Sequence, residues 1–178
     1  MKSLILVVLI ALAAACTRAA EISLTAKVIR SGYFESQFAG DSKTGSPAWL
    51  VSAEIQNLSS KLTEVGFMSS SWYNSFTLEP GSAFSVPGWA CTVNYQTLKL
   101  LASGEKISFR FPVILKKGGH LSEGQRLKIG FIFQKLHPPA RRKFGDLFEP
   151  DPVIVWSKEI GIPKVGSHSI KQEETVPE

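Results

Sequence analysis

The sequence predicts an all-β domain in which two antiparallel sheets pack face to face. Apolar and polar residues alternate in several separate stretches, a period that is typical of half-buried strands. Turn-forming Gly, Pro, Ser and Asn residues separate these stretches. No helical period occurs after the N-terminal apolar segment, so short strands joined by turns are the predicted building units.

Length and composition fit one folded domain. The chain has 178 residues, enough for a sizeable core and additional end segments. A hydrophobic content of 44% and a charged content of 20% are ordinary for a globular protein. The formal net charge is +5, but the basic residues are scattered, with clusters only at residues 116–117 and 141–143. Nucleic-acid binders concentrate their basic residues on one stripe, so no nucleic-acid partner is expected.

The N-terminus predicts export. Lys2 precedes an uncharged apolar run at residues 4–15, so residues 1–15 are interpreted as an export-signal helix. The run is too short for a convincing membrane span. Small residues directly before Cys16 resemble a bacterial lipobox, in which the acylated cysteine becomes the mature N-terminus. Leu12 stands four residues before Cys16, whereas such boxes usually place Leu three before it.

Cleavage after Ala15 without acylation is the alternative, and it would release a secreted protein. Both readings place the mature domain outside the cytoplasm. The expected location is the cell envelope, as a periplasm-facing lipoprotein with the outer membrane favoured over the inner, or the secreted fraction. An acylated Cys16 leaves Cys91 as the remaining thiol, so no internal disulfide forms, whereas a retained Cys16 allows a Cys16–Cys91 bridge. The favoured role for Cys91 is a small buried apolar side chain.

The first predicted strand covers about ten residues from Ile22, where apolar residues alternate with Ser, Thr and Lys. Residues 31–47 are rich in Gly, Ser and Asp and predict a loop, with a short strand at Tyr33 and Phe34. The next strand, at residues 49–56, turns alternate apolar residues to one face and ends in the polar turn cluster 57–61.

Five further strands are predicted at residues 63–68, 72–78, 91–101, 107–113 and 127–133, and a final strand at residues 153–160. Turns built on Pro80-Gly81 and Pro87-Gly88 interrupt the middle of the chain. Pro112 cannot donate a ladder hydrogen bond, which places its strand at an edge or a bulge.

These stretches favour an immunoglobulin-like sandwich of about seven to nine strands over residues 21–162. The absence of a cysteine pair across the sheets excludes an antibody-type domain. Residues 163–178 are polar and have no apolar period, so a disordered tail is expected there.

Four short segments resemble those of small exported bacterial immunoglobulin-like proteins, which are mostly uncharacterised. They are Asn57-Leu58-Ser59, Ser71-Trp72-Tyr73 with Phe76, Leu101-Ala102-Ser103-Gly104-Glu105 and Val155-Trp156-Ser157. The resemblance covers roughly residues 21–161 and implies the fold without an activity. Secreted bacterial proteinase inhibitors share the architecture, but this chain has no reactive-loop motif.

An aromatic segment, residues 67–76, lies at the centre of the chain. Trp72, Phe76 and Trp89 are predicted to fill the core, since buried aromatics dominate such sandwiches. Tyr73 lies on the alternate face and is the aromatic expected at the surface. A recognition surface built on the whole segment is the alternative.

No catalytic residue, metal site or cofactor is expected. Ser69, Ser70 and Ser71 lack a G-x-S-x-G setting, which favours a role as polar edge or turn residues. The histidines and Cys91 show no metal-ligand or nucleophile spacing. These histidines are His120, His137 and His168.

The connection at residues 137–151 is the stronger candidate for binding, because connections of this length often bind partners. Arg141, Arg142 and Lys143 supply positive charge, and Phe144 and Phe148 supply apolar anchors. A loop that packs its phenylalanines on the sandwich is the alternative.

The expected function is therefore a non-enzymatic, lipid-anchored envelope protein that binds an unknown protein partner or serves as a structural module. Its contact with the membrane is the lipid on Cys16. A proteinase-inhibitor-like module is the alternative, and a hydrolase or metal-binding protein is a less favoured one.

Overall fold

The computed structural model describes residues 21–36, 41–68, 71–88, 96–133 and 152–171. These residues form eleven strand segments and one short 3-10 turn. No helix within these ranges is long and apolar enough to span a bilayer. The predicted export signal, Cys16, Trp89 and Cys91 lie outside the described residues.

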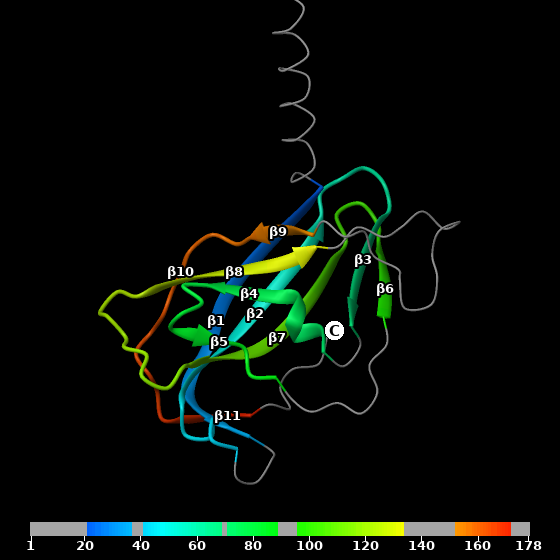
Figure 1. Ribbon diagram of the computed structural model, residues 1–178. Coiled ribbons are helices and arrows are strands. Elements are labelled where there is room, and N and C mark those ends of the chain that lie inside the picture. Colours follow the sequence, from blue (N-terminus) through cyan, green and yellow to red (C-terminus); the bar gives the residue numbers. More distant parts are fainter. Residues whose placement is uncertain (1–20, 37–40, 69–70, 89–95, 134–151, 172–178) are drawn as a thin grey trace, which may run out of the picture.

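Two sheets and a separate ribbon make up the fold (Figure 1). The first sheet has the strand order β11 (His168–Lys171), β1 (Ile22–Glu35), β2 (Pro47–Asn57), β7 (Lys106–Leu115) and β5 (Phe84–Ser85). The second has the order β10 (Ile160–Gly161), β8 (Arg126–Phe133) and β4 (Phe76–Glu79), and β9 (Val153–Trp156) also pairs with β8. The ribbon joins β3 (Thr63–Met68) to β6 (Gln96–Leu101).

This strand order is that of an immunoglobulin-like sandwich. Strands β1, β2, β7 and β5 follow the order A-B-E-D, and β4, β8 and β9 with β10 follow C-F-G. The second sheet crosses in front of the first in Figure 1. The predicted all-β sandwich is therefore confirmed, with the β3–β6 ribbon and β11 added to its frame.

An aromatic cluster forms the core between the sheets. The Phe76 ring centroid lies 4.6 Å from that of Phe111 and 5.4 Å from that of Phe131. Trp72 lies 5.3 Å from Phe109 by the same measure. The prediction that Trp72 and Phe76 fill the core is confirmed, since both are buried. Each sheet thus contributes rings to one interlocked layer.

The strand predicted at residues 72–78 begins instead as the 3-10 turn Trp72–Ser75, and β4 follows from Phe76. Side chains at alternate positions of a strand share one face. A continuous strand would therefore bury Asn74 between Trp72 and Phe76. The turn leaves Asn74 exposed while both aromatic rings stay in the core.

The final strand predicted at residues 153–160 is divided into β9 and β10 at Ser157. The Ile129 amide donates to Ser157 Oγ at 3.1 Å, and the Ser157 amide donates to the Ile129 carbonyl at 2.8 Å. The serine hydroxyl thus replaces one backbone acceptor, which interrupts the ladder. This division, with the short strands β5 and β11, raises the number of strands above the predicted seven to nine.

The expectation of a disordered tail at residues 163–178 is wrong for its first part. Strand β11 pairs in parallel with β1 over Gly32–Glu35, so the chain is ordered up to Lys171. Ile170 is fully buried on the outer side of the first sheet. It packs in a second small core with Phe34, Ala48, Leu50 and Ile114. Val165 and Ile170 lie too far apart to give an apolar period, which explains the wrong prediction. The structure does not describe residues 172–178.

The loop predicted at residues 31–47 is also shorter in the structure, because β1 continues to Glu35 and β2 begins at Pro47. Pro112 lies opposite Leu50 of β2. On its other side, β5 pairs only with Ile114 and Leu115, so Pro112 has no strand neighbour there within the described residues. The predicted edge position of Pro112 is confirmed.

Candidate functional site

The predicted partner-binding loop residues Arg141, Arg142, Lys143, Phe144 and Phe148 lie outside the described residues, as does the predicted lipidation site Cys16. Their roles stay predictions.

Tyr73 is half-buried and packs against the core rather than projecting fully into solvent. A Cβ atom added to Gly88 would lie 3.0 Å from the Tyr73 ring, so the ring rests on this glycine. Tyr73 and Asn74 line an open hollow of about 250 Å³ together with Gly81 and Ser85. The structure therefore brings these two residues and the first Pro-Gly turn together.

The other predicted polar groups are dispersed. Ser71 is buried before the 3-10 turn, His120 is exposed in the β7–β8 connection and His168 is exposed on β11. The described ranges contain no group of three His, Cys, Asp or Glu side chains placed to hold a metal ion. Ser69, Ser70, His137 and Cys91 lie outside these ranges.

The outer face of the second sheet carries a feature that the sequence interpretation missed. Register places Gly130 of β8 between Thr77 of β4 and Trp156 of β9, and places Ile132 beside Ile154. Side chains on these positions point away from the core, because their neighbours Ile129 and Phe131 point into it. Trp156 is 41% exposed and Ile154 is 43% exposed. We call Thr77, Gly130, Ile132, Ile154 and Trp156 the outer-face patch.

Gly130 holds the patch together. A Cβ atom at this position would lie 2.7 Å from Thr77 Cγ2, 2.8 Å from Ile154 Cγ2 and 2.9 Å from Trp156 Cε3. The three side chains therefore converge over the glycine, which has no side chain to separate them. A glycine within a strand commonly marks such a close approach. The result is a continuous apolar surface instead of isolated exposed residues.

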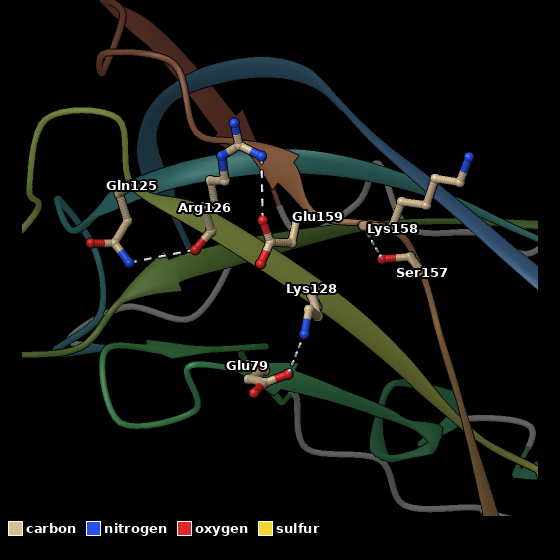
Figure 2. Close-up of polar contacts among 7 residues, drawn as sticks. All are labelled: Glu79, Gln125, Arg126, Lys128, Ser157, Lys158 and Glu159. Carbon is tan, nitrogen blue, oxygen red and sulfur yellow. Dashed lines mark hydrogen bonds and ion pairs between the residues drawn. The ribbon is translucent and has the colours of Figure 1, made fainter.

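Two ion pairs border this surface at the Arg126 end of β8 (Figure 2). Lys128 Nζ lies 3.3 Å from Glu79 Oε2, and Arg126 Nη1 lies 3.3 Å from Glu159 Oε2. All four side chains also line a hollow of about 230 Å³. Exposed ion pairs contribute little to stability, so their physical effect is a polar border to the apolar patch.

A sequence signal for the outer-face patch existed. Strand β9 reads Val-Ile-Val-Trp, with no polar residue on either face. Val155 is half-buried against the core, whereas Ile154 and Trp156 are left on the outer side. The solvated face of an antiparallel sheet normally carries polar residues, so the apolar run in β9 signals an exposed apolar face. The sequence interpretation instead favoured the connection at residues 137–151 as the binding site and did not consider the outer face of this strand.

The second sheet therefore presents apolar side chains over a glycine, with charged side chains at one border. Neither a scan against protein-family models nor a search of curated proteins found a match to this chain.

Proposed function

We propose that this chain is a non-enzymatic, exported binding module, anchored to the membrane by a lipid on Cys16, and that its outer-face patch binds a partner protein. The observation that carries the proposal is the convergence of Trp156, Ile154 and Thr77 over Gly130 on an exposed sheet face.

Physical chemistry supports binding at this face. Exposed apolar patches with a polar border mark interaction surfaces more often than scattered apolar residues do. Tryptophan is enriched among the residues that dominate binding energy. The Trp156 ring already rests against its neighbours over Gly130. Ordering it on binding therefore costs little side-chain entropy.

Lipid anchoring rests on the sequence before the sandwich. Cys16 precedes Glu21, the first described residue, by five positions. A chain segment of that length spans at most about 20 Å. An acyl group on Cys16 would thus keep the sandwich close to the membrane surface, where the partner is expected. The mass of the mature N-terminus, compared between the wild type and Cys16→Ser, tests acylation: an unmodified Cys16 contradicts it.

Binding by the patch is tested with a photoreactive amino acid at Trp156, and at Leu100 as a control. Leu100 is an equally apolar residue on the exposed side of the ribbon, and it is 55% exposed. We expect one protein to cross-link from Trp156 and not from Leu100. The purified partner should then bind Trp156→Ala at least about thirtyfold more weakly than the wild type, as loss of a dominant contact predicts, and Leu100→Ala equally well. Equal binding by Trp156→Ala contradicts the proposal.

A further inference from the structure

One edge of β1 is open over half of its length. The Leu58 amide donates to the Glu21 carbonyl at 2.8 Å, and the antiparallel register with β2 continues without a break to Val28. In such a pair, alternate residues direct both backbone polar groups to the partner strand. Leu24, Ala26 and Val28 therefore direct theirs away from β2. Within the described ranges no strand pairs with this side of β1 before Gly32.

The C-terminal part of the same β1 edge already pairs with a strand of this protein, β11. The register shifts between Val28 and Arg30, which leaves Ile29 in a bulge and 46% exposed. Beyond the bulge, β11 adds to β1 in parallel from Gly32 to Glu35. The edge of β1 is thus covered by an extended segment at one end and open at the other.

A shallow, open groove runs beside the open part of this edge. It has a volume of about 580 Å³ and lies between β1 and the segment that contains β10. Its lining residues are Ala26, Lys27 and Val28 on one side, and Ile160, Gly161, Ile162 and Pro163 on the other. The apolar side chains of Ala26, Val28, Ile160 and Ile162 are half-buried and pack against the core. A Cβ atom at Gly161 would meet nothing within 4 Å, so this wall is open to solvent.

Positive charge borders the groove. Lys27 lines it, and Lys164 follows Pro163 in the chain. Both side chains are exposed, and neither forms an ion pair with another described residue. A carboxylate on a bound segment would therefore be attracted to this edge.

We propose that the open edge of β1 binds an extended segment of a partner protein by strand addition. Main-chain hydrogen bonds form to Leu24, Ala26 and Val28, alternate small apolar side chains enter the groove, and a carboxylate pairs with Lys27. Strand addition of this kind takes its affinity from the backbone and its specificity from alternate side chains.

A second copy of this chain fits the edge less well. Antiparallel pairing of two β1 edges about Ala26 would put the Lys27 side chains of both copies on one face, diagonally adjacent. Like charges there oppose the pairing, and lysine on an edge strand is a common protection against it. The open edge belongs to β1 of the first sheet and shares no residue with the outer-face patch, so this proposal does not rest on the function proposed for that patch.

The test starts with a displayed library of random peptides selected on the full-length protein. Synthetic copies of the enriched peptides are then measured against variants. Ala26→Pro removes an N–H that points away from β2, so pairing with β2 keeps its hydrogen bonds, and proline is tolerated on strand edges. Lys27→Glu reverses the charge at the groove. Lys99→Glu is the matched control, because Lys99 is an exposed strand lysine on the distant ribbon.

We expect enriched peptides that alternate small apolar residues and carry a carboxylate. Ala26→Pro removes one main-chain hydrogen bond to the peptide and disturbs the adjacent ones. The peptides should therefore bind this variant about tenfold or more weakly than the wild type. Binding to Lys27→Glu should weaken about fivefold, whereas Lys99→Glu should bind as the wild type does. Circular dichroism shows whether Ala26→Pro is folded. If this variant does not fold, the peptide affinity of Lys27→Glu decides the test.

Three results would overturn the proposal. The first is that no peptide is enriched. The second is that Ala26→Pro, when folded, and Lys27→Glu both bind the peptides as tightly as the wild type. The third is a dimer in sedimentation analysis that Ala26→Pro dissociates, because the edge would then serve a second copy.

Discussion

The side-chain amide of Asn57 donates a hydrogen bond of 2.9 Å to the backbone carbonyl of Leu101, 44 positions further along the chain. The same nitrogen lies 2.7 Å from the Lys61 carbonyl and 3.2 Å from that of Ala102. Asn57 Oδ1 accepts from the Ser59 amide at 2.9 Å. The fully buried asparagine thus joins the end of β2 to the turn that precedes β3 and to the end of β6.

Asn57→Ala should lower the free energy of unfolding by about 2–3 kcal/mol, because several backbone groups would lose their partner inside the protein. Chemical denaturation measures the loss. Gln56→Ala is the matched control: its amide nitrogen bonds the Gly104 carbonyl at 3.1 Å, but at the exposed surface. That change should cost less than about 0.5 kcal/mol. Equal effects of the two changes would refute the role given to Asn57.

Gly32→Ala should detach β11 from the first sheet. A Cβ atom at Gly32 would lie 1.9 Å from the carbonyl oxygen of His168, a backbone atom that can move only with its strand. Hydrogen exchange at the Ile170 amide should become much faster, with a loss of stability of about 1–3 kcal/mol. Gly161→Ala is the control, since nothing lies within 4 Å of its added Cβ. Unchanged protection of Ile170 in Gly32→Ala would argue against the pairing.

Trp49→Phe should loosen the segment between β10 and β11. The indole Nε1 of Trp49 donates to the carbonyl of Pro163 at 2.9 Å, which fixes the chain where it leaves the sandwich. Phenylalanine keeps an aromatic ring in the core but has no donor, so about 1 kcal/mol of stability should be lost. Faster hydrogen exchange at Val165 and Gly166 is the expected local sign. Trp72→Phe is the control, because Trp72 is a core residue that lies far along the chain from Pro163. It should leave hydrogen exchange at Val165 and Gly166 unchanged.

The strands that the sequence predicts well are those whose alternation is strong and whose core face is continuous. Residues 63–68 and 127–133 match β3 and β8 almost residue for residue. The predicted strand boundaries are wrong where the backbone departs from a strand although apolar and polar residues continue to alternate. A 3-10 turn at Trp72–Ser75 replaces the first half of one predicted strand and leaves Asn74 exposed, and the Ser157 hydroxyl divides the last strand.

The outer-face patch and the open edge of β1 depend on neighbours that are distant in the chain. The close approach over Gly130 involves Thr77 and Trp156, which belong to two different strands. Strand β11 contributes one buried residue, Ile170, and it pairs with β1, which is the first strand in the sequence. The alternation of apolar and polar residues along one strand shows which side chains face the core, but it does not show which strands lie next to each other. The predicted loop site at residues 141–148 lies outside the described residues, so its role stays a prediction.

Asp41 should make stability depend on pH in the acidic range. The Lys43 amide donates to its carboxylate at 3.0 Å, and this bond, with the Ser36 side chain, holds the pKa of Asp41 below its ordinary value of 3.8. A lowered pKa in the folded state means that the stabilisation is complete above 3.8 and is lost as pH falls through the lower folded value. Melting temperatures measured from neutral to strongly acidic pH should therefore fall less steeply for Asp41→Asn than for the wild type. An equally steep fall in Asp41→Asn and in the wild type would contradict this role of Asp41.

Gly130→Ala should displace Trp156 and disturb the outer-face patch while the core stays in place. The added methyl group would meet the tips of Thr77, Ile154 and Trp156, which are side chains that can move outward. The expected loss of stability is about 1–3 kcal/mol, as for other overpacked positions. Fluorotryptophan NMR follows the change: the Trp156 resonance, assigned with Trp156→Phe, should shift while the signals of buried Trp49 and Trp72 stay. A shift of the buried signals instead would show that the strain enters the core, and the patch would then not be the surface feature described above.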